Sequence, residues 1–181
     1  MKIIKNVLKS ELKIRTEMDF PKKGIEFIDI NPLIMDRDNL VEIIDYFVLK
    51  LKSKKLDYII APEARGFLFG SAVAKELGIG CIPVRKKGKL PPSTVECSFG
   101  YEKEYGKDIL ELPKLIGGES YLKKRCFILD DIYATGNTIN AIKVAIESQG
   151  GKVVGVGAVI NIKELNNDKK VLSILDINET G

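Results

Sequence analysis

One stretch decides how this chain folds, and it reads Phe127-Ile128-Leu129-Asp130-Asp131-Ile132-Tyr133-Ala134-Thr135-Gly136-Asn137-Thr138. An apolar run ends in two adjacent carboxylates, and a short loop of small and hydroxyl residues follows. Ile139, Ile142 and Ile146 then recur at helical spacing. The pattern predicts a buried strand, a turn and the start of a helix. In an open parallel sheet, ligands bind at this end of the strands.

The loop and the predicted helix start are suited to hold a phosphate. Backbone N–H groups at a helix N-terminus point toward one anion, and the helix dipole adds its positive end. Gly136 permits close approach to the backbone, and Thr135 and Thr138 can donate hydroxyl hydrogen bonds. Asp130 and Asp131 can accept hydrogen bonds from vicinal hydroxyl groups or face a hydrated Mg²⁺. A phosphate and a diol one loop apart predict a site for a ribose 5-phosphate.

An isolated acid pair also has a simpler interpretation, in which Asp130 and Asp131 only finish a strand and cap a turn. The order of strand, acid pair, Thr-Gly and helix favours the ligand site instead. The stretch is not a P-loop, because Gly-x-x-x-x-Gly-Lys-Ser/Thr is absent. Gly155-x-Gly157 lies inside an apolar run and is a weak match to a dinucleotide-binding fingerprint.

Length and composition indicate one ordinary globular domain. The 181 residues suit a single core, and 45% apolar with 30% charged residues is typical of a folded chain. No apolar run is long enough to span a bilayer. Residues 1–5 lack the apolar region of a signal peptide. We therefore expect one domain over residues 1–181 and a cytoplasmic location.

The composition also restricts the chemistry. The chain has no histidine, so carboxylates and backbone groups must carry any proton transfer. Cys81, Cys97 and Cys126 are odd in number and far apart, so neither disulfides nor a zinc site is expected. The net charge of +4 fits attraction of a small anion and is too weak and dispersed to indicate nucleic acid.

Apolar periodicity predicts the remaining elements. Helices are expected at 2–17, at 38–53, from about 67 to 77, and from the central loop to Gly150-Gly151. Strands are expected at 25–30, 56–61, 80–85, 153–160 and 171–177. The alternation indicates an α/β fold with a mainly parallel sheet. The first helix would pack on the domain or face a partner subunit.

Two further stretches follow predicted strands. Glu63, Ala64, Arg65 and Gly66 form a short loop before a helix, where backbone N–H groups could hold a second anion; the alternative is a plain turn with a surface ion pair. Residues 85–89 place four cations after the next strand, either as a solvated loop or as a polyanion site. Residues 93–106 then form an excursion, and residues 107–112 are predicted to be its return strand.

Five motifs in order resemble the adenine-specific members of the type I phosphoribosyltransferase family. They are Asp-Phe-Pro-x-x-Gly, Glu-Ala-Arg-Gly-Phe, Arg-Lys-x-Gly-Lys-Leu-Pro, Glu-Tyr-Gly-Lys and Asp-Asp-x-x-Ala-Thr-Gly, spread from about residue 18 to about residue 146. The resemblance implies the fold of that family: a mainly parallel central sheet flanked by helices. It also implies a flexible β-hairpin, the hood, at about residues 86–112.

The resemblance further implies a reaction of purine salvage. The 5-phosphoribosyl group would pass from 5-phosphoribosyl 1-pyrophosphate to N9 of adenine, giving AMP and pyrophosphate. Mg²⁺ would be held through the donor pyrophosphate and waters, near Asp130 and Asp131 and without direct protein ligands. A homodimer is expected, with no nucleic acid or membrane partner.

The family pattern also assigns substrate contacts. Asp130 and Asp131 would lie at the ribose hydroxyls, and Ala134, Thr135, Gly136, Asn137 and Thr138 would hold the 5-phosphate. Glu63, Ala64 and Arg65, with Gly66, would form the pyrophosphate loop, often through a cis peptide. Phe27 would pack on the purine, Lys89 would face the pyrophosphate, and Tyr105 would belong to the hood.

Three residues are expected to act in catalysis. Arg85 and Lys86 would neutralise the leaving pyrophosphate, and Glu104 in the hood would manage the purine proton. Three features depart from the family pattern: an apolar Ile28 where a basic residue is usual, a slightly longer hood, and Asn137 at a frequent glycine position.

Two other functions remain open at this point. A guanine, hypoxanthine or xanthine phosphoribosyltransferase would share the donor site and differ in how the backbone reads the purine edge. A nucleotide-sensing regulator without catalytic activity would normally carry a DNA-binding segment. Only about twenty residues precede the first motif, which is too few for a helix-turn-helix module.

Overall fold

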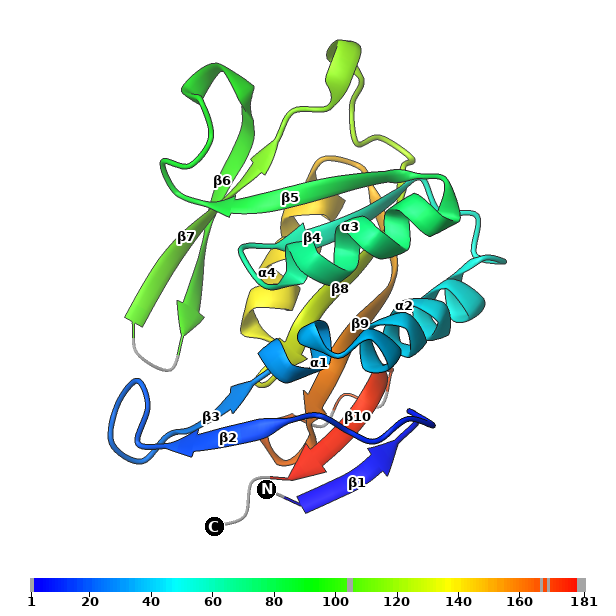
Figure 1. Cartoon of the computed structure of the whole chain (residues 1–181). Coiled ribbons are helices and arrows are strands. Elements are labelled where there is room, and N and C mark those ends of the chain that lie inside the picture. Colours follow the sequence, from blue (N-terminus) through cyan, green and yellow to red (C-terminus); the bar gives the residue numbers. More distant parts are fainter. Residues whose placement is uncertain (1, 104–105, 167, 169, 179–181) are drawn as a thin grey trace.

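The computed structural model describes residues 2–103, 106–166, 168 and 170–178. Its centre is an eight-stranded sheet with the order β1-β10-β9-β8-β4-β5-β7-β6 (Figure 1). The strands are β1 (Lys2–Asn6), β4 (Tyr58–Pro62), β5 (Gly80–Lys86), β6 (Val95–Lys103), β7 (Gly106–Pro113), β8 (Arg125–Tyr133), β9 (Lys152–Ile162) and β10 (Leu172–Asn178). The pairs from β10 to β5 are parallel, and only the two margins are antiparallel. The predicted mainly parallel sheet is confirmed.

Helices cover both faces of this sheet (Figure 1). They are α1 (Asn31–Met35), α2 (Arg37–Leu51), α3 (Gly66–Leu77) and α4 (Asn137–Ser148). α2 and α3 pack on one face around Phe47 and Phe69, and α4 packs on the other through Ile142 and Ile146. No helix in the described part of the chain has the length and apolar content needed to cross a membrane.

The helix ends follow local chemistry. Asp36 caps α2 by accepting a hydrogen bond from the backbone N–H of Asn39 at 2.9 Å. Gly78 ends α3 in the left-handed conformation, as its place after Leu77 predicts. Short α1 was not predicted, and it precedes α2 directly.

The helix predicted over residues 2–17 is wrong. Residues 2–6 form β1, which pairs antiparallel with β10, and Arg15–Met18 forms β2, which pairs with β3 (Glu26–Asp29). The apolar side chains that suggested a helix are instead distributed along an extended path, where Val7 and Leu8 pack against the core. The unpaired edge of β10 offers backbone hydrogen bonds that outweigh a weak local helix preference.

The excursion after β5 is a hairpin made of β6 and β7, and the predicted return strand is confirmed. β7 also pairs with β5, with Arg85 opposite Glu111 and Lys86 opposite Leu110. The hairpin therefore extends the central sheet. Figure 1 shows it and the β2–β3 ribbon projecting on the side where the parallel strands end.

The central stretch differs from its prediction in one respect. β8 continues past Asp130 and Asp131 to Tyr133, so the acids lie within the strand and the turn begins only at Ala134. Gly136 then has a φ of 82° and immediately precedes α4. The predicted order of strand, loop and helix is confirmed, with the strand running two residues beyond the acid pair.

Candidate active site

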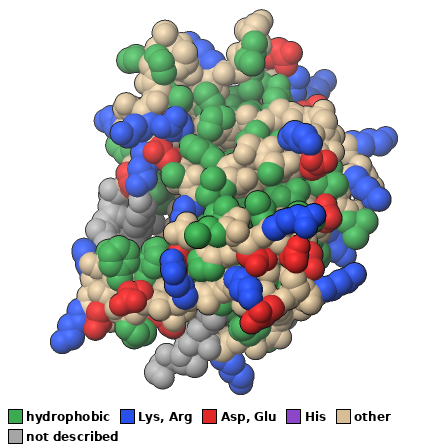
Figure 2. All heavy atoms as spheres, viewed as in Figure 1, with side chains coloured by type: hydrophobic (Ala, Val, Ile, Leu, Met, Phe, Trp, Pro, Cys, Tyr) green, Lys and Arg blue, Asp and Glu red, His purple; other side chains and the backbone are tan. Residues whose placement is uncertain are grey.

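Three of the predicted motifs meet at the carboxyl ends of three neighbouring strands. β8, β4 and β5 are adjacent in the sheet, and each is followed directly by one of these stretches. Figure 2 shows Lys and Arg side chains gathered on the side of the molecule where β5 ends. The arrangement places carboxylates, two helix N-termini and a basic loop around one edge of the sheet, as the general rule for ligand sites in parallel sheets requires.

The acid pair is tied to the neighbouring loop by an ion pair. Arg65 Nε lies 2.7 Å from Asp131 Oδ2, and the Asp131 side chain is only 7% exposed. The N–H bond is not aimed at this oxygen, so Oδ2 has a charge partner but no hydrogen-bond donor. The backbone N–H of Asp131 donates to Asp130 Oδ1 at 2.8 Å. The pair is thus held at the sheet edge, and Asp131 Oδ2 is closed off from solvent.

The environment of Asp130 disfavours its charged form. Burial and the adjoining Asp131 carboxylate raise the pKa of Asp130 well above its usual value, although the Asp131 N–H and Arg65 act in the opposite direction. Two carboxylates and one guanidinium leave the cluster short of positive charge. A cation or hydroxyl donors arriving with a ligand would therefore favour ionisation of Asp130.

Gly66 lets the start of α3 approach the acid pair. A Cβ atom at this position would lie 2.9 Å from Asp130 Oδ1 and 2.9 Å from Pro62 Cδ. Since both neighbours belong to strand ends, they have little room to move. The glycine brings the positive end of α3 against the carboxylates.

The ring of Tyr133 packs against the loop after β8 at Gly136. A Cβ atom on Gly136 would meet the Tyr133 ring at 2.8 Å, and the positive φ already favours glycine at this position. Asn137, which departs from the family pattern, is the first residue of α4 and does not need the left-handed conformation. That departure leaves the loop backbone unchanged.

The 63–66 loop carries a cis peptide between Glu63 and Ala64, as the resemblance implied. Glu63 Oε2 accepts hydrogen bonds from Lys86 N at 2.8 Å and from Arg85 Nε at 3.1 Å. The Lys86 N–H and then Arg85 lower the pKa of Glu63. Glu63 therefore ties the loop after β4 to the end of β5.

The basic stretch at the end of β5 is anchored by its backbone, and two of its lysines lie at the surface. Lys86 and Lys89 are exposed. Gly88 N donates to the buried Glu111 carboxylate at 3.1 Å, and Lys89 N donates to Lys86 O at 3.1 Å. The Arg85 guanidinium lies 5.7 Å from the centre of the Phe67 ring.

Phe27 belongs to β3 and joins this constellation through Arg65, whose guanidinium lies 5.6 Å from the centre of its ring. A cavity of about 250 Å³ lies against Phe27, lined also by residues of β2 and by Phe20. Ile28, the second departure from the family pattern, is 6% exposed and packs in the core. The Ile28 side chain is therefore part of the core, and it supplies no charged group beside Phe27.

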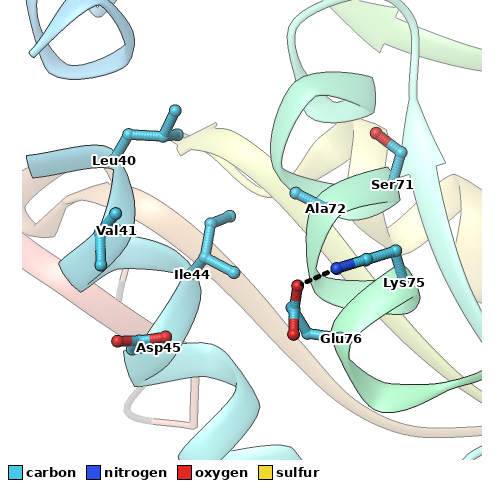
Figure 3. A pocket seen from close by; sticks show the side chains of 8 residues that line it. All are labelled: Leu40, Val41, Ile44, Asp45, Ser71, Ala72, Lys75 and Glu76. Carbon is cyan, nitrogen blue, oxygen red and sulfur yellow. Dashed lines mark hydrogen bonds and ion pairs between the residues drawn. The ribbon is translucent and has the colours of Figure 1, made fainter. Parts of the chain in front are cut away.

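Glu104 and Tyr105 lie outside the described residues, so their expected place in the hood stays a prediction. A second cavity of about 450 Å³ lies elsewhere, between α2 and α3 (Figure 3). Its lining includes Leu40, Val41 and the Lys75–Glu76 ion pair, and none of the predicted site residues. The chemistry therefore concentrates at the sheet edge rather than in this groove.

Several residues that shape the site escaped the sequence analysis. Tyr133 and Phe67 look like ordinary core residues in the sequence, and Glu111 looks like a surface acid on a hairpin. Asn166 lies beyond the motifs, yet its side chain donates to the carbonyl of Ala134 at 2.8 Å. Only the three-dimensional contacts reveal these roles, because no spacing rule links such distant positions.

Comparisons with known proteins agree with this geometry. Residues 36–180 match the family model of a phosphoribosyl transferase domain. The adenine phosphoribosyltransferase of Clostridium acetobutylicum is 48% identical over 160 residues, covering 87% of this chain and 89% of that protein. The crystal structure of adenine phosphoribosyltransferase from Thermoanaerobacter pseudethanolicus is 40% identical with a TM-score of 0.82, covering 91% and 96%. That from Saccharomyces cerevisiae, complexed with an iminoaltritol bisphosphate and adenine, is 33% identical with a TM-score of 0.77, covering 90% and 94%.

The raised pKa of Asp130 predicts a pH-dependent ligand affinity. The protonated form contributes stability to the ligand-free protein at low pH, and that contribution is lost as pH rises through the raised pKa. Ribose hydroxyls favour the ionised acceptor, so affinity for ribose 5-phosphate should increase as pH rises from the ordinary range of an aspartate carboxyl through the raised pKa of Asp130.

Calorimetric titration of wild type and Asp130→Asn measures this effect. Ionisation of the phosphate itself affects both proteins, so the difference between the two slopes isolates Asp130. The variant should show the shallower slope. Equal slopes would show that Asp130 does not titrate with the ligand.

Proposed function

The chain belongs to the phosphoribosyltransferase family, and within it to the adenine phosphoribosyltransferases, and we propose that it makes AMP from adenine and 5-phosphoribosyl 1-pyrophosphate. Pyrophosphate is the second product. One observation carries this proposal: Asp130 and Asp131 lie near the end of β8, and the loop that starts at Ala134 leads from there into the N-terminus of α4. One end of that arrangement suits a diol and the other suits a phosphate.

The donor ribose would lie along the end of β8. Asp130 and Asp131 would accept hydrogen bonds from its hydroxyls, and the position of the partly exposed Asp130 near the end of β8 supports this role. Ala134, Thr135, Gly136, Asn137 and Thr138 would surround the 5-phosphate with backbone N–H groups at the N-terminus of α4. Held at both ends, the ribose would present C1 at a fixed position.

The pyrophosphate would leave toward β4 and β5. Ala64 and Arg65 would offer backbone N–H groups, while Arg85, Lys86 and Lys89 would supply positive charge. The C1–O bond breaks as the bond to N9 of adenine forms, the electron pair leaves with pyrophosphate, and the purine proton passes to a base, the role proposed for Glu104. Cations that face the leaving group stabilise its growing charge, which the oxocarbenium-like transition state requires.

The purine would pack on Phe27, and backbone groups of residues 25–27 would read its edge. The cavity of about 250 Å³ against the Phe27 ring supports this position. The cation–π contact of Phe27 with Arg65 supports it as well, since Arg65 also holds Asp131. Base and ribose sites would then share one arginine.

Mg²⁺ is the proposed cofactor. The described residues contain no group of three or more acidic, cysteine or histidine side chains that could hold a metal by themselves. Asp130 and Asp131 nevertheless supply hard oxygen acceptors, which suit a cation that keeps its waters and substrate oxygens. When bound, Mg²⁺ would neutralise charge on the pyrophosphate.

We also propose that residues 1–181 form one domain, with the hood at about 86–112. Because β7 pairs directly with β5, movement of the hairpin would be linked to Arg85 and Lys86. A hood closed over the reacting atoms would exclude water, which would otherwise hydrolyse the donor. Since the charged donor does not cross membranes, the cytoplasm is the proposed location.

A base-specificity assay tests the proposed function. With Mg²⁺ and the donor, adenine should give AMP with kcat/KM at least about a hundredfold above that for guanine or hypoxanthine. Chromatography of the nucleotide product measures each rate. Turnover of guanine without adenine would replace this proposal with its closest alternative, and absence of pyrophosphate release with every base would favour a regulator.

Glu104→Gln tests the proposed proton role in the hood. If Glu104 manages the purine proton, kcat should fall about a hundredfold or more, because general acid–base groups contribute at least that much. Glu96→Gln makes the same change at an exposed position of β6 and should keep kcat. Near wild-type turnover of Glu104→Gln would remove its catalytic role.

A homodimer is the proposed assembly. Val41 on α2 and Leu68 on α3 are 48% and 49% exposed, an apolar surface that a second copy would cover. Light scattering should give about twice the mass of one 20.1 kDa chain. A mass of one chain at the assay concentration would contradict the dimer.

A further inference from the structure

The short 3₁₀ segment after β9, η3 (Lys163–Leu165), ends at Asn166 and lies against the loop that follows β8. The side-chain amide of Asn166 reaches three oxygens. Its Nδ2 lies 2.8 Å from Ala134 O, 2.8 Å from Ile162 O and 3.0 Å from Asn161 Oδ1. This contact joins positions 32 residues apart in the chain.

The orientation of this amide is fixed by its neighbours. Three oxygen acceptors surround Nδ2, and the backbone N–H of Asp168 donates to Oδ1 at 3.2 Å. Turning the amide over would set an oxygen against three oxygens and an N–H against an N–H. Asn161, which supports the amide, is fully buried and lies beside Tyr133 in the sheet register. The Asn166 side-chain amide is therefore held by a rigid, buried neighbour.

The planar trans peptide between Ala134 and Thr135 then relates the direction of the Ala134 carbonyl to that of the Thr135 N–H. In a planar peptide the C=O and the following N–H point in opposite directions. Because the carbonyl of Ala134 points to Asn166, the N–H of Thr135 points away from it. Thr135 itself is an exposed residue.

A second contact holds the same segment under the loop. Tyr133 Oη donates to Asp168 Oδ2 at 3.4 Å, and the Tyr133 ring is the surface on which Gly136 rests. The region after β9 thus contacts the loop in two ways. Asn166 binds the Ala134 carbonyl, and Asp168 binds Tyr133, whose ring lies against Gly136. Both contacts come from residues outside the five sequence motifs.

We propose that Asn166 is a positioning residue for the 5-phosphate, because its amide turns the Ala134–Thr135 peptide so that the Thr135 N–H faces the phosphate. This inference rests on the proposed function. Asn166 does not touch the substrate itself. It removes an alternative peptide orientation, in which a carbonyl oxygen would oppose the anion.

The test compares two ligands that occupy different parts of the site. Asn166→Ala should weaken binding of ribose 5-phosphate about tenfold, since one oriented hydrogen bond to an anion is worth about that factor. Pyrophosphate, which lies at the 63–66 loop, should bind within about twofold of wild type. In steady state, KM for the donor should rise about tenfold while kcat changes little. Calorimetric titration and initial rates measure both.

Two further variants make the test specific. Glu164→Ala removes an exposed side chain from the same segment and should bind both ligands as wild type does. Asn166→Asp keeps the shape and places a carboxylate oxygen among three oxygens, so it should weaken ribose 5-phosphate binding more than Asn166→Ala does. If the Asn166→Asp variant fails to fold, the comparison of Asn166→Ala with Glu164→Ala still tests the positioning role.

The outcomes separate the inference from the proposed function. Equal losses for both ligands, or no loss for either, in a folded Asn166→Ala protein would overturn the positioning role. Selective loss of ribose 5-phosphate affinity supports it. Failure of the wild-type protein to bind ribose 5-phosphate would instead overturn the proposed function itself.

Discussion

The contact between Arg65 and Asp131 is the interaction on which the site depends. It joins the loop after β4 to the end of β8, and the same guanidinium lies over Phe27. A buried carboxylate without a cation nearby would carry a large desolvation penalty. Arg65 reduces that penalty while leaving an Asp131 oxygen without a hydrogen-bond donor. One arginine therefore joins two strand ends of the site and the Phe27 ring.

Much of the remaining site is built by groups that hold a backbone segment rather than a substrate. Glu63 links the 63–66 loop to β5, Glu111 holds Gly88, and Asn166 holds the carbonyl of Ala134. In each case a side-chain polar group satisfies a backbone N–H or C=O and so fixes the direction of a loop. The loops that would surround two phosphates are thereby set before any ligand arrives, which reduces the entropy lost on binding.

The two sides of the site differ in how firmly they are held. The β8 loop rests on Tyr133 and Asn166 within the central sheet, whereas the basic stretch after β5 leads into the β6–β7 hairpin at the sheet margin. Chemistry that needs a fixed ribose and a cover over the reacting atoms suits this division. The parallel centre holds the loop after β8, and the antiparallel margin carries the β6–β7 hairpin.

The sequence by itself determined the elements whose signal is local: the apolar run of β8, the acid pair, the Thr-Gly loop and the helical spacing of α4. It also indicated that Glu63, Arg65, Arg85 and the acids lie at one edge of the sheet, because each is at or just after the predicted carboxyl end of a strand. Tertiary structure alone decided that residues 2–6 form a strand, since only the open edge of β10 makes that favourable. It alone brought Asn166 to Ala134 and Asp168 to Tyr133, because contacts across 32 and 35 residues leave no periodicity in the sequence.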